Sequence, residues 1–134
     1  ALDSRGVGLS GKPNTGYTIP RFAQDLRELI EHLGLDDVVL AGLSLGGFTT
    51  VEYLRQFGPR NVGAIVLMEM TPRLPSAPGW EHPTFGDFPE PMAKGYGAAL
   101  RADRAIYNAF FQAAFLVPPT GAELAAMVAN TWLT

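Results

Sequence analysis

The clearest structural signal in the sequence is the stretch at residues 42–47, Gly-Leu-Ser-Leu-Gly-Gly. The preceding residues 38–41, Val-Val-Leu-Ala, form a short apolar run rich in β-branched side chains, which predicts a strand. The residues that follow carry apolar side chains at helical spacing. A strand, a Gly-x-Ser-x-Gly turn and a helix in this order predict a tight, strained turn that lifts Ser44 off the sheet. We expect Gly42 and Gly46 to be required because larger side chains would collide there.

The predicted position of Ser44 suits a nucleophile. A helix that begins just after the serine presents unpaired N–H groups and the positive end of its dipole beside the hydroxyl. Both would stabilise an oxyanion, and the backbone N–H of Leu45 is the candidate donor. A serine hydroxyl also needs a histidine base that is oriented by a carboxylate. The alternative is a tight turn with a purely structural use.

The segments on either side of the turn predict a βαβ unit. Thr18 is the expected N-cap of a first helix that ends at Gly34. The apolar stripe of this helix consists of Phe22, Leu26, Leu29, Ile30 and Leu33. The helix after the turn is expected to end at Gly58-Pro59, and residues 62–70 form a second, nearly continuous apolar run. Two apolar strands joined by a helix predict a parallel sheet with strands buried on both faces.

The composition changes after the second apolar run. Residues 71–91 are rich in proline and have no periodicity, which predicts an irregular segment. Residues 92–116 are expected to form a helix with several aromatic side chains. Thr120-x-x-Glu123 is a capping-box pattern that predicts the start of a last helix.

These features resemble the α/β-hydrolase fold superfamily. The turn at Gly42–Gly46 matches its nucleophile elbow, and Asp3-x-Arg5-Gly6-x-Gly8-x-Ser10 matches a loop that follows a strand in many members. The resemblance is strongest to the branch of esterases, C–C hydrolases and non-haem haloperoxidases. It implies an α/β class and a partial α/β-hydrolase fold, with a core over residues 1–72. Residues 73–134 would then begin a helical cap, and the alternative is that they form ordinary core helices.

The resemblance also implies that parts of the site lie outside this chain. In the family, the second oxyanion donor comes from a loop that would precede Ala1, and the catalytic histidine follows the last strand, beyond Thr134. We therefore expect an internal fragment of a longer protein that is catalytically inert when isolated.

Glu69 is the candidate acid. It ends the second apolar run, at the strand edge where catalytic groups of open α/β sheets gather. The resemblance implies the same role, because a minority of family members, including haloalkane dehalogenases, place a carboxylate at this position. The alternative is a structural carboxylate, paired for example with Arg73.

Four other polar residues are expected to lie outside the catalytic machinery: His32 as a structural or solvated residue, His82 as a surface or pocket-rim residue, and Asp3 and Arg5 as structural residues. His32 lies near the end of the first helix, and His82 lies in a proline-rich segment with no strand before it, so neither is expected to be the catalytic base. Asp3 and Arg5 are expected to form a charged pair that holds the N-terminal loop beside the site.

Composition excludes several functions. The 134 residues have a net charge of −3 and no basic cluster, which argues against nucleic acid as a partner. No apolar run is long enough to predict a membrane span. Cysteine is absent, which suits a reducing, cytoplasmic location. No metal or cofactor is expected, because the sequence contains neither metal-ligand spacing, a phosphate loop nor a dinucleotide fingerprint.

The sequence therefore predicts a serine hydrolase that acts through an acyl-enzyme on a carboxylic ester or related carbonyl compound. Aromatic side chains in the predicted cap favour an uncharged, moderately hydrophobic small-molecule substrate. Dehalogenases and epoxide hydrolases of the resembling family use an aspartate nucleophile, and a serine at position 44 argues against both chemistries. The alternatives are a non-catalytic small-molecule-binding domain and an inactive fragment.

Overall fold

A computed structural model of the chain describes residues 1–71, 73–80, 86–103, 105–106, 109 and 115–132. They belong to two compact units, Ala1–Leu74 and Pro75–Thr134. In the first unit an N-terminal loop leads into the elements α1 (Ile19–His32), β1 (Val38–Leu43), α2 (Leu45–Phe57) and β2 (Val62–Met68). That the residues after 72 form a cap stays a prediction.

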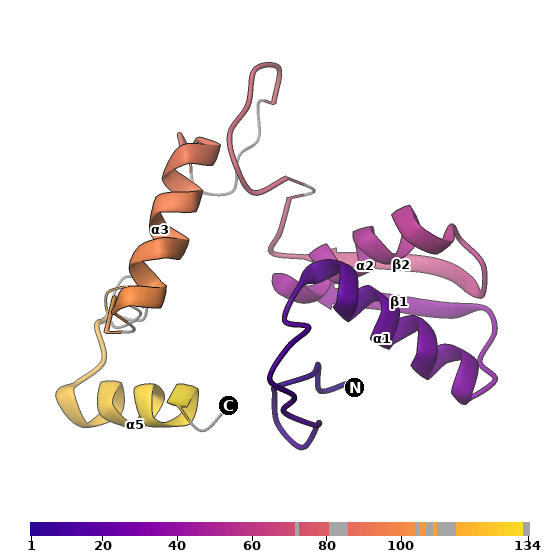
Figure 1. The fold of residues 1–134 in the computed structure, drawn as a ribbon, viewed down its shortest axis with the longest axis horizontal. Helices are drawn as coiled ribbons and strands as arrows, with labels where there is room; N and C mark the ends of the chain where they lie inside the picture. Colours follow the sequence, from indigo (N-terminus) through magenta and orange to yellow (C-terminus); the bar gives the residue numbers. More distant parts are fainter. Residues whose placement is uncertain (72, 81–85, 104, 107–108, 110–114, 133–134) are drawn as a thin grey trace. The chain divides into compact units, whose positions relative to one another are not determined.

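The two strands form the expected parallel βαβ unit (Figure 1). The pairing of β1 with β2 runs from Val38 opposite Val62 to Leu43 opposite Met68, with one irregularity after Val38. α2 connects the two strands. β1 is two residues longer than the apolar run that predicted it, because Gly42 and Leu43 continue the pairing. As a result, both strands end at the same edge of the sheet.

The core lies between the helices and one face of the sheet. It is built from buried side chains on α1, β1 and α2, namely Ala23, Ile30, Leu40 and Tyr53. The hydroxyl of Tyr53 donates to the carbonyl of Arg60 at 3.2 Å, which satisfies its polar group inside the core. Burial of these side chains is the main force that holds α1 and α2 on the sheet.

The expectation that both faces of the strands are buried was wrong for the described residues. Along β1 burial alternates, so that Leu40 is buried whereas the neighbouring Val39 is 61% exposed. Residues 63–68 of β2 are all exposed. The physical reason is that α1 and α2 cover only the face of β1 that carries Leu40, and a strand needs a second layer on its other face to be buried throughout.

The first helix follows its sequence signals. Thr18 caps α1 and accepts a hydrogen bond from the Arg21 N–H at 3.4 Å, and Pro20 lies in the first turn. Gly34 follows the helix with a φ of 62°, a left-handed conformation that glycine adopts without steric cost. The predicted helix is confirmed. The apolar stripe predicted from the sequence did not include Ala23. This residue is fully buried, because its small side chain lets the core pack closely.

The N-terminal loop is held to α1 by a different contact from the one expected. Arg5 does not pair with Asp3. Instead its Nε and Nη2 atoms donate to the two carboxylate oxygens of Asp25, each at 2.6 Å. Arg21 also contacts Asp25, at 2.8 Å. The carboxylate of Asp3 accepts from the backbone N–H of Leu9 at 3.0 Å. The two residues therefore stabilise the loop independently of each other.

The Arg5–Asp25 pair predicts an acid-sensitive contribution to stability. The hydrogen bonds from Arg5 hold the pKa of the Asp25 carboxyl below its ordinary value. The unfolded chain therefore binds more protons, and the contribution is present above the ordinary aspartate pKa and is lost as the pH falls below about 4. Asp25→Asn should lower the free energy of unfolding at neutral pH and flatten its dependence on acid pH, measured by urea denaturation. Arg5→Gln should produce the same flattening, and an unchanged acid dependence in both variants would contradict the assignment.

The second unit contains α3 (Glu90–Ala102) and α5 (Gly121–Trp132). The expected helix over residues 92–116 was wrong in its extent, because α3 ends at Ala102 and Asp103 is extended, with φ of −144° and ψ of 106°. The Asp103 side chain accepts from the Ala105 N–H at 2.8 Å, a local bond that competes with helix continuation. Most of the expected aromatic cluster, Tyr107, Phe110 and Phe111, lies outside the described residues.

The capping box at the start of α5 is confirmed. The Glu123 carboxylate accepts from the Thr120 N–H at 2.8 Å, and the Glu123 N–H donates to Thr120 Oγ1 at 3.4 Å. The two residues thus satisfy each other's backbone donors at the start of the helix.

Candidate active site

Ser44 occupies the turn between β1 and α2 in a strained conformation. Its φ of 49° and ψ of −112° are rare for a residue with a side chain. The Ser44 N–H donates to the carbonyl of Met68 on β2 at 3.0 Å, and the Ser44 carbonyl accepts from the Gly47 N–H at 2.9 Å and the Phe48 N–H at 3.3 Å. These backbone bonds on both sides of the residue are what maintain the strain.

The side chain of Ser44 is available for chemistry. The residue is exposed, and its hydroxyl does not cap α2. Within the described part of the chain, this hydroxyl has no hydrogen-bond partner. Backbone strain combined with an uncommitted hydroxyl at the sheet edge is the arrangement expected of a serine nucleophile.

The glycines of the turn do not all have the expected role. A Cβ on Gly42 would lie 2.4 Å from the carbonyl carbon and oxygen of Gly46, so the requirement for glycine at 42 is confirmed. The prediction that glycine is also required at position 46 was wrong, because a Cβ there would meet no atom within 4 Å. Gly46 approaches Gly42 with its carbonyl group, not with the side on which a Cβ would project. The sequence prediction missed Gly47, where a Cβ would lie 2.5 Å from Cγ of Met70.

The strain at Ser44 predicts a stabilising substitution. Glycine adopts a positive φ readily, and the strain at such a residue costs about 1–3 kcal/mol, part of which is offset by the larger backbone entropy of glycine in the unfolded chain. Ser44→Gly should therefore raise the free energy of unfolding by about 1 kcal/mol. Ser44→Ala is the matched control, since it removes the hydroxyl but keeps the strain. Equal stabilities of the two variants in urea denaturation would argue against strain at this residue.

Leu45 is the first residue of α2, so its N–H has no acceptor within the helix. No described residue accepts a hydrogen bond from it. This N–H is therefore free to donate to a group that lies beside Ser44, at the positive end of the helix dipole. Its role as oxyanion donor stays a prediction.

Glu69 follows β2 directly and has a φ of 47°. Leu43 and Met68 are the last residue pair of the two strands, so Ser44 and Glu69 each stand one residue beyond it at the same sheet edge. The side chain of Glu69 is exposed, and no described residue forms a hydrogen bond or ion pair with it. A carboxylate at a buried strand end would need a partner to offset the cost of leaving water. The exposed Glu69 carboxylate is solvated by water and does not need one. Its role as the acid stays a prediction.

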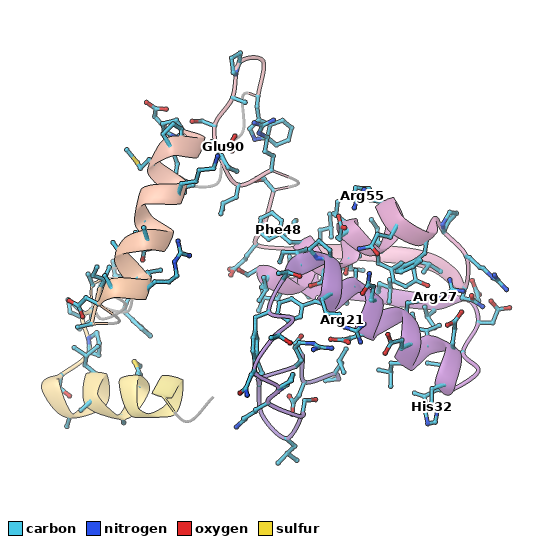
Figure 2. The ribbon with its side chains drawn as sticks, in the orientation of Figure 1. Arg21, Arg27, His32, Phe48, Arg55 and Glu90 are labelled. Atoms are coloured by element: carbon cyan, nitrogen blue, oxygen red, sulfur yellow. The ribbon has the colours of Figure 1, made fainter. Side chains whose placement is uncertain are left out.

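The structure brings no described histidine to Ser44. His32 is exposed in the last turn of α1, which leads into the start of β1, whereas Ser44 follows the end of that strand. Figure 2 shows His32 well away from Phe48, which lies in the first turn of α2. His82 lies outside the described residues. Of the described residues, the structure therefore places no histidine where it could serve as the base of Ser44.

Among the residues that the structure describes, no group of three or more histidine, aspartate or glutamate side chains is arranged so that it would hold a metal ion. None of the described helices has the length and apolar character needed to span a bilayer.

The chain matches known proteins over much of its length. The model of a family described as alpha/beta hydrolase fold matches residues 1–117. A non-heme haloperoxidase of Rhodococcus erythropolis is 36% identical over 74 residues, which are 55% of this chain and 27% of that protein. A soluble epoxide hydrolase of Corynebacterium sp. is 38% identical over 95 residues, which are 69% of this chain and 30% of that protein.

Solved structures show the same similarity. An esterase from Exiguobacterium antarcticum superposes on 97% of this chain with a TM-score of 0.69 and 26% sequence identity, and the match covers 46% of the esterase. The chain therefore spans less than half the length of each of these three proteins.

Proposed function

The chain belongs to the alpha/beta hydrolase fold family, and on this basis we propose that it is part of a serine hydrolase whose nucleophile is Ser44. The observation that carries the proposal is the turn at Ser44. Its backbone has a positive φ, its hydroxyl is exposed and uncommitted, and the helix that starts beside it has a free first N–H. This combination supplies both a nucleophile and a donor for the charge that develops during attack.

The proposed reaction is acyl transfer. Oγ of Ser44 forms a bond to the substrate carbonyl carbon while its proton passes to a histidine that the described residues do not include. The negative oxygen of the tetrahedral intermediate accepts a hydrogen bond from the Leu45 N–H. The alcohol then leaves with the proton from the histidine, and water hydrolyses the acyl-serine by the same steps in reverse order.

Glu69 is the proposed acid that orients the histidine. Two observations support this role: its place at the end of the strand adjacent to that of Ser44, and a carboxylate with no described partner. An uncommitted carboxylate at this edge is available to accept a hydrogen bond from an imidazole ring.

The surroundings of Ser44 favour an uncharged substrate. Leu43 and Met68, the last residues of the two strands, are 56% and 41% exposed, and Leu45, the first residue of α2, is 49% exposed. An acyl group that covers these side chains would gain about 25 cal/mol for each Å² of apolar surface removed from water. We therefore propose a moderately hydrophobic carboxylic ester as substrate. A cytoplasmic location also stays a prediction.

The test uses the full-length protein with uncharged p-nitrophenyl esters of short and medium chain length, an aryl epoxide and a negatively charged succinyl ester. We expect turnover of the uncharged esters, slower turnover of the charged ester and no opening of the epoxide. Binding of esters without release of p-nitrophenol would overturn the proposal in favour of a small-molecule-binding protein. Epoxide opening without ester hydrolysis would overturn it in favour of a different nucleophile.

A further inference from the structure

The direction of the Leu45 N–H depends on contacts made by the Ser44 carbonyl. Both groups belong to one planar peptide unit, so a contact that fixes the carbonyl also fixes the N–H on the opposite side. The Ser44 carbonyl accepts from the Gly47 N–H at 2.9 Å and, less closely, from the Phe48 N–H at 3.3 Å. The positions of Gly47 and Phe48 in the first turn of α2 therefore help to set where the Leu45 N–H points.

Met70 holds Gly47 in place. The atoms Cγ, Sδ and Cε of Met70 would lie 2.5, 3.1 and 3.2 Å from a Cβ on Gly47, so the whole thioether lies across the space that a side chain at 47 would occupy. β2 ends at Met68, the backbone of Glu69 has a φ of 47°, and Met70 follows directly. The Met70 side chain thus packs the segment after β2 against the first turn of α2, in addition to the backbone bond between the Ser44 N–H and the Met68 carbonyl.

We propose that Met70 is a positioning residue for the oxyanion site. Its thioether fills the space left by Gly47 and presses on the first turn of α2, which keeps the Ser44–Leu45 peptide oriented with its N–H toward the developing oxyanion. Methionine suits this task because an unbranched, polarisable side chain fits closely over a backbone. The inference rests on the proposed role of Ser44 as nucleophile.

The test measures inactivation of the full-length protein by an alkyl fluorophosphonate. In this reaction Oγ of Ser44 bonds to phosphorus while its proton passes to the same proposed histidine, and fluoride leaves from phosphorus. The phosphoryl oxygen accepts the same hydrogen bonds as an oxyanion. Loss of an oxyanion donor costs about 10²–10³ in rate, so its misplacement in Met70→Ala should lower the inactivation rate constant about tenfold with little change in KI. Met70→Leu keeps the bulk and should retain the wild-type rate. Leu35→Ala, at the opposite end of β1, should also retain it.

Exchanging the side-chain sizes of residues 47 and 70 distinguishes a positioning role of Met70 from a role in general packing. Gly47→Ala should lower the rate about 100-fold, because its Cβ displaces Met70 and with it the first turn of α2. Adding Met70→Ala makes room for the new methyl group and should restore the rate to within about tenfold of the wild type. If Gly47→Ala does not fold, as judged by circular dichroism, the comparison of Met70→Ala with Met70→Leu decides alone.

The outcomes distinguish the two proposals. Failure of the reagent to modify Ser44 in the wild-type protein would overturn the proposed function. Modification of the wild type together with an unchanged rate in Met70→Ala would overturn only the role of Met70. A slower rate in Met70→Ala that Met70→Leu recovers would support both.

Discussion

Replacing Ser44 with alanine is expected to lower kcat/KM for ester hydrolysis in the full-length protein by about 10⁴-fold or more. In the proposed reaction the Ser44 oxygen is the atom that bonds to the carbonyl carbon, so its removal leaves the mechanism without its nucleophile. The same substitution should leave the free energy of unfolding nearly unchanged, because the hydroxyl is exposed and uncommitted. Initial rates with a p-nitrophenyl ester and urea denaturation measure the two quantities.

Ser10→Ala is the matched control for this experiment. Ser10 lies in the same unit, but its hydroxyl donates to the Asp3 carbonyl at 2.6 Å and so serves the N-terminal loop. We expect this variant to keep most of the ester activity. Retention of activity in Ser44→Ala would show that another group attacks the ester.

Gly42→Ala is expected to lower the free energy of unfolding by about 3 kcal/mol or more. The added Cβ would lie 2.4 Å from the carbonyl carbon and oxygen of Gly46 and 2.5 Å from the nitrogen of Gly47. These are backbone atoms, and they cannot rotate away as a side chain can. To accommodate the methyl group, the first turn of α2 must move away from β1, and the backbone bonds that fix Ser44 would be lost with it.

Gly46→Ala is the control with the same change of one methyl group. Its Cβ meets no atom within 4 Å, and alanine is favoured over glycine inside a helix by about 1 kcal/mol. The variant should therefore be as stable as the wild type or slightly more so. Urea denaturation of both variants measures the difference, and a comparable loss of stability in the two would contradict the close contact at Gly42.

The elements around Ser44 were predictable because their signals are local. The cap at Thr18, the apolar runs of β1 and β2 and the stop at Gly58 each act within a few residues, and all four elements of the first unit have their predicted type and order. The family was likewise predictable from the serine turn in its strand–helix setting. Short-range steric rules govern such features, so the sequence alone carries them.

Contacts between distant segments were not predictable in the same way. Arg5 selects Asp25, twenty residues away, over Asp3, because the fold brings α1 beside the N-terminal loop. The contact of Gly47 with Met70 depends on how the end of β2 meets α2. The end of α3 at Ala102 was missed for a different reason, because the Asp103 side chain forms a local bond with the Ala105 N–H that competes with the helix in an apolar pattern that otherwise favours a longer one.

For the candidate site, the sequence predicted where Ser44, Leu45 and Glu69 stand relative to the strands. It did not predict that Glu69 would be exposed and have a positive φ. Exposure of a strand end depends on which other elements cover the sheet, and no local pattern encodes that. The orientation of the first turn of α2 likewise arises from tertiary packing.

The most direct test of the account is the mass of the peptide that contains Ser44 after a reaction with a slowly hydrolysed ester has been stopped with acid. We predict that this peptide gains the mass of the acyl group, that fragmentation places the acyl group on Ser44, and that Ser44→Ala carries none. Steady ester turnover with an unmodified Ser44 peptide, or with the acyl group on another residue, would contradict the assignment of Ser44 as the nucleophile.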